Sequence, residues 1–353
     1  MTHRSDDEIA FVVPGRLDQL TGGYLFDRRV VEGLRARGRA VRVIELSVTD
    51  PKANGAVLAD LADGTKTAVD GLALANLAET IASQARRLRL VAFVHGPLAL
   101  ETSLSPAAAK RAADREARLL SQVCGVLCPS RSTAAAVEGY GVSRERIAVV
   151  PPGTVRPTRP PRPRRSPVRA LLCVANVVPR KGHELLIEAL ARIRDLDWSL
   201  SCVGSLECDP ATVRAVRRRI RTFGLGRRIT LAGACPPQSV ARAYRAADAF
   251  VLPSFHEGYG MVYAEAMVHG LPVIATTAGA IPETVLPQAG LLAPPGDPAA
   301  LARALRRVIT EPTLATRLAM GSRAVGARLP DWPQATETWE RAFARLAALD
   351  PPL

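Results

Sequence analysis

The 353-residue chain contains little lysine, few aromatic side chains and no long apolar run. Its formal net charge of +14 comes almost entirely from arginine, since its only lysines are Lys52, Lys66, Lys110 and Lys181. Aromatic residues make up 4% of the chain, so the stacking platforms that bind single-stranded nucleic acids are missing. The arginines are dispersed over many expected helix faces and form no recognition helix. The sequence therefore predicts no nucleic-acid partner, despite its high charge.

Membrane-spanning and secreted proteins are also disfavoured. No run approaches the roughly 18 apolar residues that a membrane span needs, and the N-terminal MTHRSDDEIA lacks the apolar core of a signal peptide. The cysteines include no C-x-x-C pair and are expected to be reduced, mostly buried thiols. We therefore expect a cytoplasmic protein. The basic stretches 156–169 and 214–228 are interpreted as a stiff linker and a solvated helix face, with contact to the anionic inner face of a membrane as the alternative.

Short β-branched runs alternate with longer amphipathic segments, a pattern typical of parallel sheets covered by helices on both faces. We expect one series of strands at 8–14, 41–46, 69–74, 90–95, 124–128 and 146–150, and a second series at 169–175, 198–203, 228–232, 248–252, 272–276 and 289–292. The proline-rich stretch between them predicts a semi-rigid connector. The expected organisation is an α/β fold with a first domain at 1–155, a linker at 156–168, a second domain at 169–331 and a C-terminal segment at 332–353. The helix expected at 334–349 has an apolar stripe and would pack back on the first domain.

Two carboxylates, Glu257 and Glu265, flank a glycine-rich turn after an expected strand. Ligands of open α/β sheets bind at the carboxyl ends of the strands, and the N-terminus of the following helix favours an anion. Glu265 would lie roughly 7–8 Å along that helix, too far for both acids to share a proton or a metal. They could instead hold hydroxyls at the two ends of an extended ligand with an anionic middle, such as a nucleotide diphosphate sugar. In the alternative interpretation, Glu257 only stabilises the helix N-terminus and Glu265 faces solvent.

Positive charge follows another expected strand, at Arg180 and Lys181. Cations at a helix N-terminus oppose the helix dipole, so their placement suggests an anionic partner rather than an ordinary charged first turn. In the first domain, Gly22 and Gly23 open a helix after a strand and could offer backbone amides to an anion. His95 ends the strand expected at 90–95 and would lie at the same sheet edge, although a single histidine is more often structural.

These pieces resemble the retaining family 4 glycosyltransferases. The similarity covers most of the chain and is most specific in the E-x7-E pair and in the motifs Val174-Ala-Asn-Val-Val-Pro-Arg-Lys-Gly182, Ala247-Asp-Ala-Phe-Val-Leu-Pro-Ser254, Gly270-Leu-Pro-Val-Ile-Ala275 and Leu291-Leu-Ala-Pro-Pro-Gly-Asp297. The resemblance implies the GT-B architecture, in which two Rossmann-like parallel-sheet domains face each other across a cleft. One departure is Ala175-Asn176, where many relatives have Gly-Arg. This departure would transfer an arginine role in phosphate binding to Arg180.

The resemblance also implies a role for each matching residue. Glu257 would hold the transferred sugar with the backbone of Gly258, Tyr259 and Gly260, and Glu265 would accept hydrogen bonds from the ribose. Lys181 and Arg180 would bind the diphosphate with help from Gly22 and Gly23, and His95 would approach the donor sugar near the reacting carbon. The base would be bound by residues that follow two neighbouring strands, namely Val203, Gly204, Gly233 and Ala234.

The activity implied is retaining transfer of a hexose from a nucleotide sugar, with UDP favoured over GDP, to a hydroxyl acceptor. The resemblance further implies front-face displacement, no cofactor and no metal. Asp195-Leu-Asp197 matches the D-x-D of metal-dependent transferases but precedes its strand, and is interpreted as surface turn residues. The acceptor is expected at the loops around Gly22, 65–70 and 96–104. The alternatives are a nucleotide-sugar epimerase or phosphorylase on the same fold, and a non-catalytic basic module that binds nucleic acid or membrane.

Overall fold

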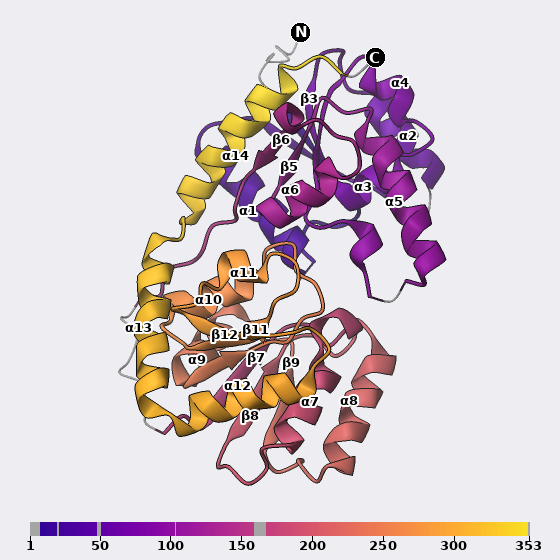
Figure 1. Ribbon diagram of the computed structural model, residues 1–353. Coiled ribbons are helices and arrows are strands. Elements are labelled where there is room, and N and C mark those ends of the chain that lie inside the picture. Colours follow the sequence, from indigo (N-terminus) through magenta and orange to yellow (C-terminus); the bar gives the residue numbers. More distant parts are fainter. Residues whose placement is uncertain (1–7, 20, 48–50, 103, 159–166, 352–353) are drawn as a thin grey trace. The chain divides into compact units, whose positions relative to one another are not determined.

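The chain divides into two compact units, each built on its own sheet. The computed structural model describes residues 8–19, 21–47, 51–102, 104–158 and 167–351. Unit 1 comprises Met1–Gly153 and Pro330–Leu353, and unit 2 comprises Thr154–Leu329. Both sheets are six-stranded and parallel, with helices packed against them (Figure 1). The predicted α/β class with two parallel-sheet domains is therefore confirmed. None of the helices in the described ranges is both long and apolar enough to cross a membrane.

The sheet of unit 1 has the strand order β2-β1-β3-β4-β5-β6, and every neighbouring pair is parallel. Its strands are β1 (Ile9–Val13), β2 (Val41–Glu45), β3 (Lys66–Asp70), β4 (Arg89–Phe93), β5 (Gly125–Cys128) and β6 (Ile147–Val149). The chain leaves β1 towards β2 on one side and returns to β3 on the other. The carboxyl ends of β1 and β3 thus form a topological switch point, the usual place for a ligand in such a sheet.

Helices cover both faces of this sheet, as the continuous apolar strands require. They are α1 (Gly22–Ala36), α2 (Pro51–Ala59), α3 (Gly71–Asn76), α4 (Ile81–Ala85), α5 (Pro106–Leu120), α6 (Arg131–Glu138) and α14 (Trp332–Ala347), with short 3-10 turns η1 (Leu98–Leu100) and η2 (Arg144–Arg146). Strand β1 shows the two layers: Phe11 and Val13 pack with α1 and α14, whereas Ala10 and Val12 pack on the opposite face.

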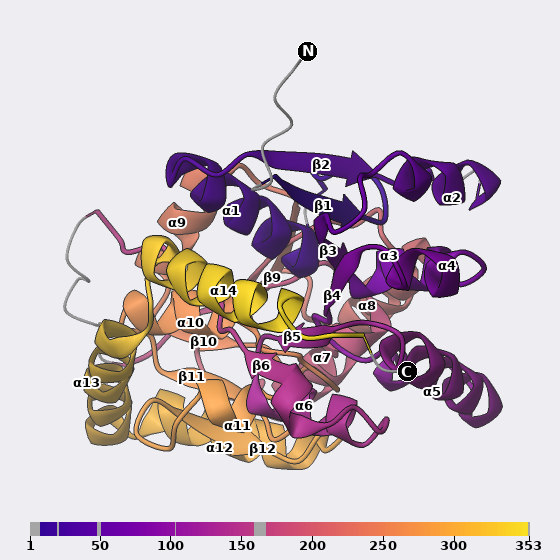
Figure 2. The same cartoon turned by 90° about the horizontal axis from the view of Figure 1, so that it is seen from above.

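Helix α14 comes from the end of the chain but belongs to the core of unit 1. It lies beside α1 (Figures 1 and 2), and its Trp339 stacks on Phe11 with ring centroids 5.7 Å apart and on Phe343 at 4.9 Å. Asp331 begins the helix with a capping box that pairs it with Gln334. The prediction that the C-terminal helix packs on the first domain is confirmed.

The sheet of unit 2 has the order β12-β11-β10-β7-β8-β9 and is also parallel throughout. Its strands are β7 (Ala170–Val174), β8 (Ser199–Val203), β9 (Ile229–Gly233), β10 (Ala249–Val251), β11 (Val273–Thr276) and β12 (Gly290–Ala293). Successive strands first extend the sheet from β7 to β9 and then from β10 to β12 on the other side. The switch point of unit 2 therefore lies between β7 and β10.

The helices of unit 2 are η3 (Pro179–Lys181), α7 (His183–Ala191), α8 (Pro210–Thr222), α9 (Pro237–Ala246), α10 (Met261–Val268), α11 (Ile281–Thr284), α12 (Pro298–Thr310) and α13 (Pro312–Arg328). Their apolar faces and the strands share one continuous core. Arg156 donates hydrogen bonds to the carbonyls of Gly326, Ala327 and Leu329, and so satisfies the end of α13. Most of the predicted proline-rich linker, residues 159–166, lies outside the described residues.

One predicted strand is wrong in its position along the sequence. The strand expected at 69–74 is instead β3 at Lys66–Asp70, and residues 71–76 form α3. The reason is a helix cap: the Asp70 carboxylate accepts hydrogen bonds from Leu72 N at 2.7 Å and Ala73 N at 3.3 Å, which ends the strand and starts the helix. The same shift corrects the acceptor loop predicted at 65–70, because these residues are almost all strand. Each of the other predicted strands overlaps an observed one.

Candidate functional site

The predicted acid and the predicted cations of unit 2 meet at its switch point. Arg180 and Lys181 belong to η3, which follows β7, and Glu257 lies in the loop between β10 and α10. Because β7 and β10 are neighbours in the sheet, their following loops come together at its carboxyl edge. Backbone bonding joins the two loops, since Phe255 N donates to Arg180 O at 2.8 Å.

Glu257 is the centre of this cluster and is only 5% exposed. Its Oε1 accepts hydrogen bonds from Lys181 Nζ and from Ser254 Oγ, each at 2.6 Å. Its Oε2 lies 3.4 Å from Arg180 Nη1, and the same guanidinium nitrogen donates to the backbone carbonyl of His256 at 2.9 Å. Lys181 and Arg180 keep 17% and 24% of their side chains exposed. A buried anion thus holds two partly exposed cations in place.

The charge of Glu257 is stabilised by its surroundings. Burial alone would raise the pKa of this carboxyl, but the charges of Lys181 and Arg180, with hydrogen bonds from Lys181 and Ser254, lower it below its usual range. The group is therefore ionised at neutral pH. A carboxylate fixed in this way can accept further hydrogen bonds but cannot act as a proton donor at that pH.

The close approach of these two loops depends on Gly182. This residue has a φ of +68°, in the left-handed region. A Cβ atom at this position would lie 2.3 Å from the carbonyl oxygen of Pro253, the residue before Ser254. Any other residue would push η3 away from the end of β10, and with it the cations from Glu257.

The second predicted acid, Glu265, is half-buried on α10, which begins just after Gly260. Its Oε2 accepts a hydrogen bond from the buried Tyr244 hydroxyl at 2.9 Å. Burial raises the pKa of Glu265, and the bond from Tyr244 opposes this effect. The Tyr244 ring is itself fixed by stacking on His269 at 5.2 Å. One oxygen of Glu265 is therefore oriented by the protein.

The residues predicted to bind the base come together on neighbouring strands. Val203 ends β8 and is in register with Gly233, the last residue of β9. Gly204 N donates to Gly233 O at 2.9 Å, and Ala234 follows directly. Asn176 accepts a hydrogen bond from Ser205 N at 2.9 Å and so links the loops after β7 and β8. Gly258 and Tyr259 lie between Glu257 and α10, where Tyr259 O accepts a bond from Thr284.

The predicted residues of unit 1 form their own cluster at that unit's switch point. Gly22 and Gly23 are the first residues of α1, and His95 follows β4. His95 Nε2 lies 2.8 Å from Asp27 Oδ1 and 3.2 Å from Asp70 Oδ2. Gly23 approaches the same ring, because a Cβ there would lie 3.2 Å from His95 Cδ2.

Sequence reasoning assigned no specific role to four side chains of these clusters, although one of them, Asp70, ends the stretch 65–70 that was expected near the acceptor: Ser254, Tyr244, Asp27 and Asp70. Asp70 is the last residue of β3 and precedes Gly71, so it could have been found if the bounds of this strand had been predicted correctly. Asp27 stands beside Arg28 and Arg29 on α1 and reads as part of a solvated face, although it is 1% exposed. Nothing in the local sequence marks Ser254 and Tyr244 as partners of the two glutamates.

Within the described ranges, two groups of side chains have the donor atoms and the spacing to hold a metal ion. The first is the cluster of Asp27, Asp70 and His95, and the second consists of Cys173, His183 and Cys202. In the second group, the contact with Cys202 and burial raise the pKa of Cys173. Burial, with the charge of Lys181, lowers the pKa of His183 to about 4. The Cys173 thiol is thus protonated and the His183 imidazole neutral in the metal-free protein.

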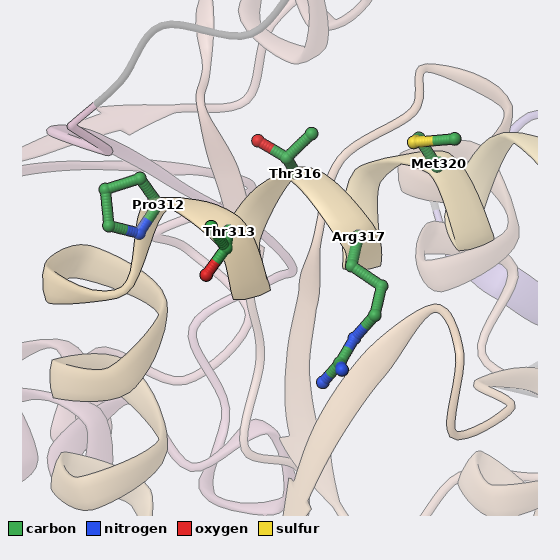
Figure 3. Close-up of a pocket in the computed structure, with 5 residues that line it drawn as sticks. All are labelled: Pro312, Thr313, Thr316, Arg317 and Met320. Carbon is green, nitrogen blue, oxygen red and sulfur yellow. The ribbon is translucent and has the colours of Figure 1, made fainter.

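Two other features, the D-x-D stretch of the sequence and a hollow on the surface, lie away from these clusters. Asp195 pairs with Arg306 at 2.8 Å and Asp197 with Arg169 at 3.0 Å, and all four side chains are exposed. An open hollow on the first turns of α13 is lined by Pro312, Thr313, Thr316, Arg317 and Met320 (Figure 3). All five residues come from one helix and include no acid or nucleophile other than threonine hydroxyls. The hollow contains none of the predicted site residues.

Comparison with known families connects this geometry to sugar transfer. Residues 168–311 match the family model described as "Glycosyl transferases group 1", and residues 66–155 match "Glycosyltransferase Family 4". Together the two models cover well over half of the chain, and the first contains Arg180, Lys181, Glu257 and Glu265.

Individual proteins give the same result. The chain is 28% identical to an MMP alpha-(1->4)-mannosyltransferase of Mycolicibacterium hassiacum, over 73% of this chain and 67% of that protein. It is 32% identical to a D-inositol 3-phosphate glycosyltransferase of Corynebacterium glutamicum, over 60% of this chain and 52% of that protein. The matched region thus spans between about half and two thirds of these relatives.

Solved structures share the fold. A sucrose-phosphate synthase from Thermosynechococcus elongatus superposes with a TM-score of 0.82 at 23% identity, covering 97% of this chain and 99% of that one. Anabaena HepE in complex with UDP-glucose superposes with a TM-score of 0.76 at 19% identity, covering 96% and 99%. With the two family models matched over its first and second parts, the chain belongs to the group 1 and family 4 glycosyltransferases.

Proposed function

We propose that this protein transfers a hexose from a nucleotide diphosphate sugar to a hydroxyl acceptor, with retention of the anomeric configuration and without a metal. The observation that carries the proposal is the Lys181–Glu257–Arg180 cluster at the switch point of unit 2, where two cations and a buried acid share one sheet edge. A diphosphate needs the cations, and a sugar hydroxyl needs the acid.

The ion pairs do not occupy all donors of the cations. Lysine has three N–H donors and arginine five, and both side chains are partly exposed. Lys181 can therefore donate to Glu257 and to a phosphate oxygen at the same time. Glu257 orients Lys181 in advance, so that little conformational freedom is lost when the diphosphate binds.

In the reaction that we propose, the bond between the anomeric carbon and the diphosphate oxygen breaks while a bond to the acceptor oxygen forms on the same face. The acceptor proton passes to an oxygen of the departing diphosphate. Lys181 and Arg180 stabilise the negative charge that develops on this leaving group. Electrostatic stabilisation of developing charge is usually the largest single contribution to the rate of such a step. Glu257 holds a hydroxyl of the transferred sugar, and His95 of unit 1 is proposed as a further donor of hydrogen bonds to a substrate oxygen.

The donor is proposed to be a UDP-sugar. UDP and UDP-glucose are the ligands named for the HepE structures, which share the fold. Glu265, oriented by Tyr244, is proposed to accept hydrogen bonds from the ribose. The base is proposed to lie beside Gly233, the last residue of β9, where a Cβ atom would meet nothing within 4 Å. The acceptors of the relatives differ from one protein to another, so the acceptor class is left to experiment.

A donor screen tests the proposal directly. The protein is incubated with UDP-sugars and GDP-sugars and a small-molecule extract of cells, and release of the nucleotide is measured with and without EDTA. We expect release of UDP that depends on the extract and is unchanged by EDTA, and an α-linked product from an α-linked donor by NMR. Absence of nucleotide release with every donor would contradict the proposed activity. Dependence on added metal, or an inverted product, would contradict that part of the proposal alone.

The role of Glu265 predicts a selective effect on donor binding. Glu265→Gln should raise the KM for the donor roughly 10- to 100-fold with a smaller change in kcat, because hydrogen bonds to a charged acceptor contribute about 1.5–3 kcal/mol. Steady-state kinetics at varied donor concentration measures both constants. Glu188→Gln is the control, since Glu188 also accepts one side-chain hydrogen bond, from Arg192, but lies on α7. An unchanged KM in Glu265→Gln would remove this residue from the nucleotide site.

A further inference from the structure

The histidine of unit 1 is held by two carboxylates that come from different elements. Asp27 lies on α1, Asp70 is the last residue of β3, and His95 follows β4. Asp27 is 1% and Asp70 3% exposed. Both carboxylates approach the same ring nitrogen, Nε2, at 2.8 and 3.2 Å. Two buried acids facing one nitrogen is more than is needed to orient a neutral imidazole.

We propose that Asp27 and Asp70 are positioning residues that hold His95 as an imidazolium, with its Nε2–H directed to the two carboxylates and its Nδ1–H left as a donor for a substrate oxygen. The last step rests on the proposed function. A doubly protonated ring keeps a donor at Nδ1, whereas a neutral ring with its proton on Nε2 would present an acceptor there. The carboxylates thus decide which kind of group His95 offers.

The ring has little freedom to choose another orientation. Phe93 packs against it with centroids 4.2 Å apart and Phe26 at 5.6 Å. Gly23 lies on its Cδ2 side, close enough that a Cβ there would come within 3.2 Å of the ring. Asp70 is fixed in turn, because its other oxygen caps α3 through Leu72 N. The site is therefore assembled by the fold before any substrate binds.

The second ring nitrogen remains available. No group in the described part of the chain forms a hydrogen bond with His95 Nδ1, and this atom is not among the buried polar atoms that lack a partner. The side chain keeps 21% of its surface exposed. An Nδ1–H donor can therefore be reached from solvent, whereas Nε2 is occupied by the carboxylates.

Electrostatics supports the charged form. Burial alone would lower the pKa of His95, but the charge of Asp27 and hydrogen bonds to Asp27 and Asp70 raise it to about 10. Burial raises the pKa of Asp27 to about 7, with the charge of Asp70 adding to the rise and that of His95 opposing it. The two carboxyl groups therefore favour the imidazolium form of His95 over the neutral ring.

Other groups near the ring do not offset this arrangement. Tyr24 of α1 is another titratable side chain that interacts with the cluster. Burial, with the charge of Asp70, raises the pKa of its hydroxyl. It is therefore a neutral phenol at pH 7. From α14, the uncharged Trp332 packs on Phe26. Asp27 Oδ2 has no hydrogen-bond partner among the described residues, so the hydrogen bonding of this carboxyl group is directed to His95 through Oδ1.

The test uses the full-length protein labelled with 15N-histidine. The chain has five histidines, and the spectrum of His95→Gln identifies the His95 signals by their loss. We expect both ring nitrogens of His95 to carry protons from pH 6 to pH 8. In Asp27→Asn the His95 titration should move down by about 1–3 pH units, as expected for the loss of an adjacent opposite charge, and Asp27→Glu should restore part of the shift. Asp114→Asn removes an exposed carboxylate of unit 1 and should change nothing.

Kinetics then connects the charge state to turnover. Asp27→Asn and Asp70→Asn should lower kcat about tenfold or more, with little change in the donor KM and with the alkaline limb of the pH profile moved to lower pH. A wild-type His95 that is neutral at pH 7 would overturn the proposal even if neither variant folds. Stoichiometric zinc or manganese that requires Asp27 would also overturn it, in favour of a metal site. A chain with the expected NMR behaviour but no sugar transfer would refute the proposed function and leave the charge state of His95 intact.

Discussion

Replacing Glu257 by glutamine is expected to lower kcat/KM for sugar transfer by roughly 100- to 1,000-fold, the range found when a fixed charged or polar group is removed from a transition-state site. Glutamine has nearly the same shape, but it offers a neutral oxygen to the sugar hydroxyl and to Lys181. The two cations would lose the anion that holds them, so their position against the leaving group would also be less well defined.

The measurement is steady-state nucleotide release, combined with thermal unfolding of the same preparations. We expect Glu257→Gln to lower the free energy of unfolding by about 1–3 kcal/mol, because Lys181 and Arg180 lose a buried partner. Assays are therefore run well below the melting temperature of the variant. Asp195→Asn is the matched control, since Asp195 also pairs with an arginine but is 57% exposed and lies outside the cluster. Full turnover in a folded Glu257→Gln protein would show that the acid has no part in transfer.

Replacing Lys181 by alanine is expected to remove about half or more of the stabilisation that UDP gives to the protein. A ligand at 100 times its dissociation constant stabilises the folded state by about 2.7 kcal/mol. Charge-assisted hydrogen bonds contribute about 1.5–3 kcal/mol, so the variant should bind UDP roughly 10- to 100-fold more weakly. The measurement is the melting temperature as a function of UDP concentration, without added metal.

Lys110→Ala provides the comparison for this experiment. Lys110 pairs with Asp114 at 2.8 Å, but its side chain is 77% exposed and it belongs to unit 1. The substitution Lys110→Ala removes the same charge as Lys181→Ala, but at a residue outside the Lys181–Glu257–Arg180 cluster. Equal UDP-dependent shifts in the two variants would mean that Lys181 does not bind the diphosphate.

The fold could be predicted almost completely from the sequence, and the reason is its regularity. Strands such as Ile9–Val13 and Leu171–Cys173 are apolar on both faces, because helices cover both sides of a parallel sheet. This pattern is visible in a single sequence. The order of the strands, and hence the two switch points, is not, because it depends on which strands pair across long stretches of chain.

The candidate site could be predicted mainly where a residue lies in a loop that follows a strand. Lys181 and Glu257 do, and the structure brings them to within 2.6 Å. Tyr244 does not, since it reaches Glu265 from the last turn of α9, and its partner cannot be found from local spacing. Asp27 was missed for a related reason: a carboxylate beside two arginines on a helix looks solvated until the packing of α1 is known. Sequence reasoning also did not reveal that Lys181 and Arg180 both pair with Glu257.

The placement of α14 affects the order in which the chain can fold during synthesis. Unit 2 is one continuous segment, whereas unit 1 needs both the first 153 residues and the last 24. Trp339 and Phe343 fill the apolar layer over β1 and β4, so a nascent chain carries that layer uncovered until α14 has been synthesised. Unit 1 therefore begins to emerge from the ribosome before unit 2 but is completed after it, and a chain that stops between Leu329 and Trp339 would expose apolar side chains of unit 1 even though unit 2 is whole.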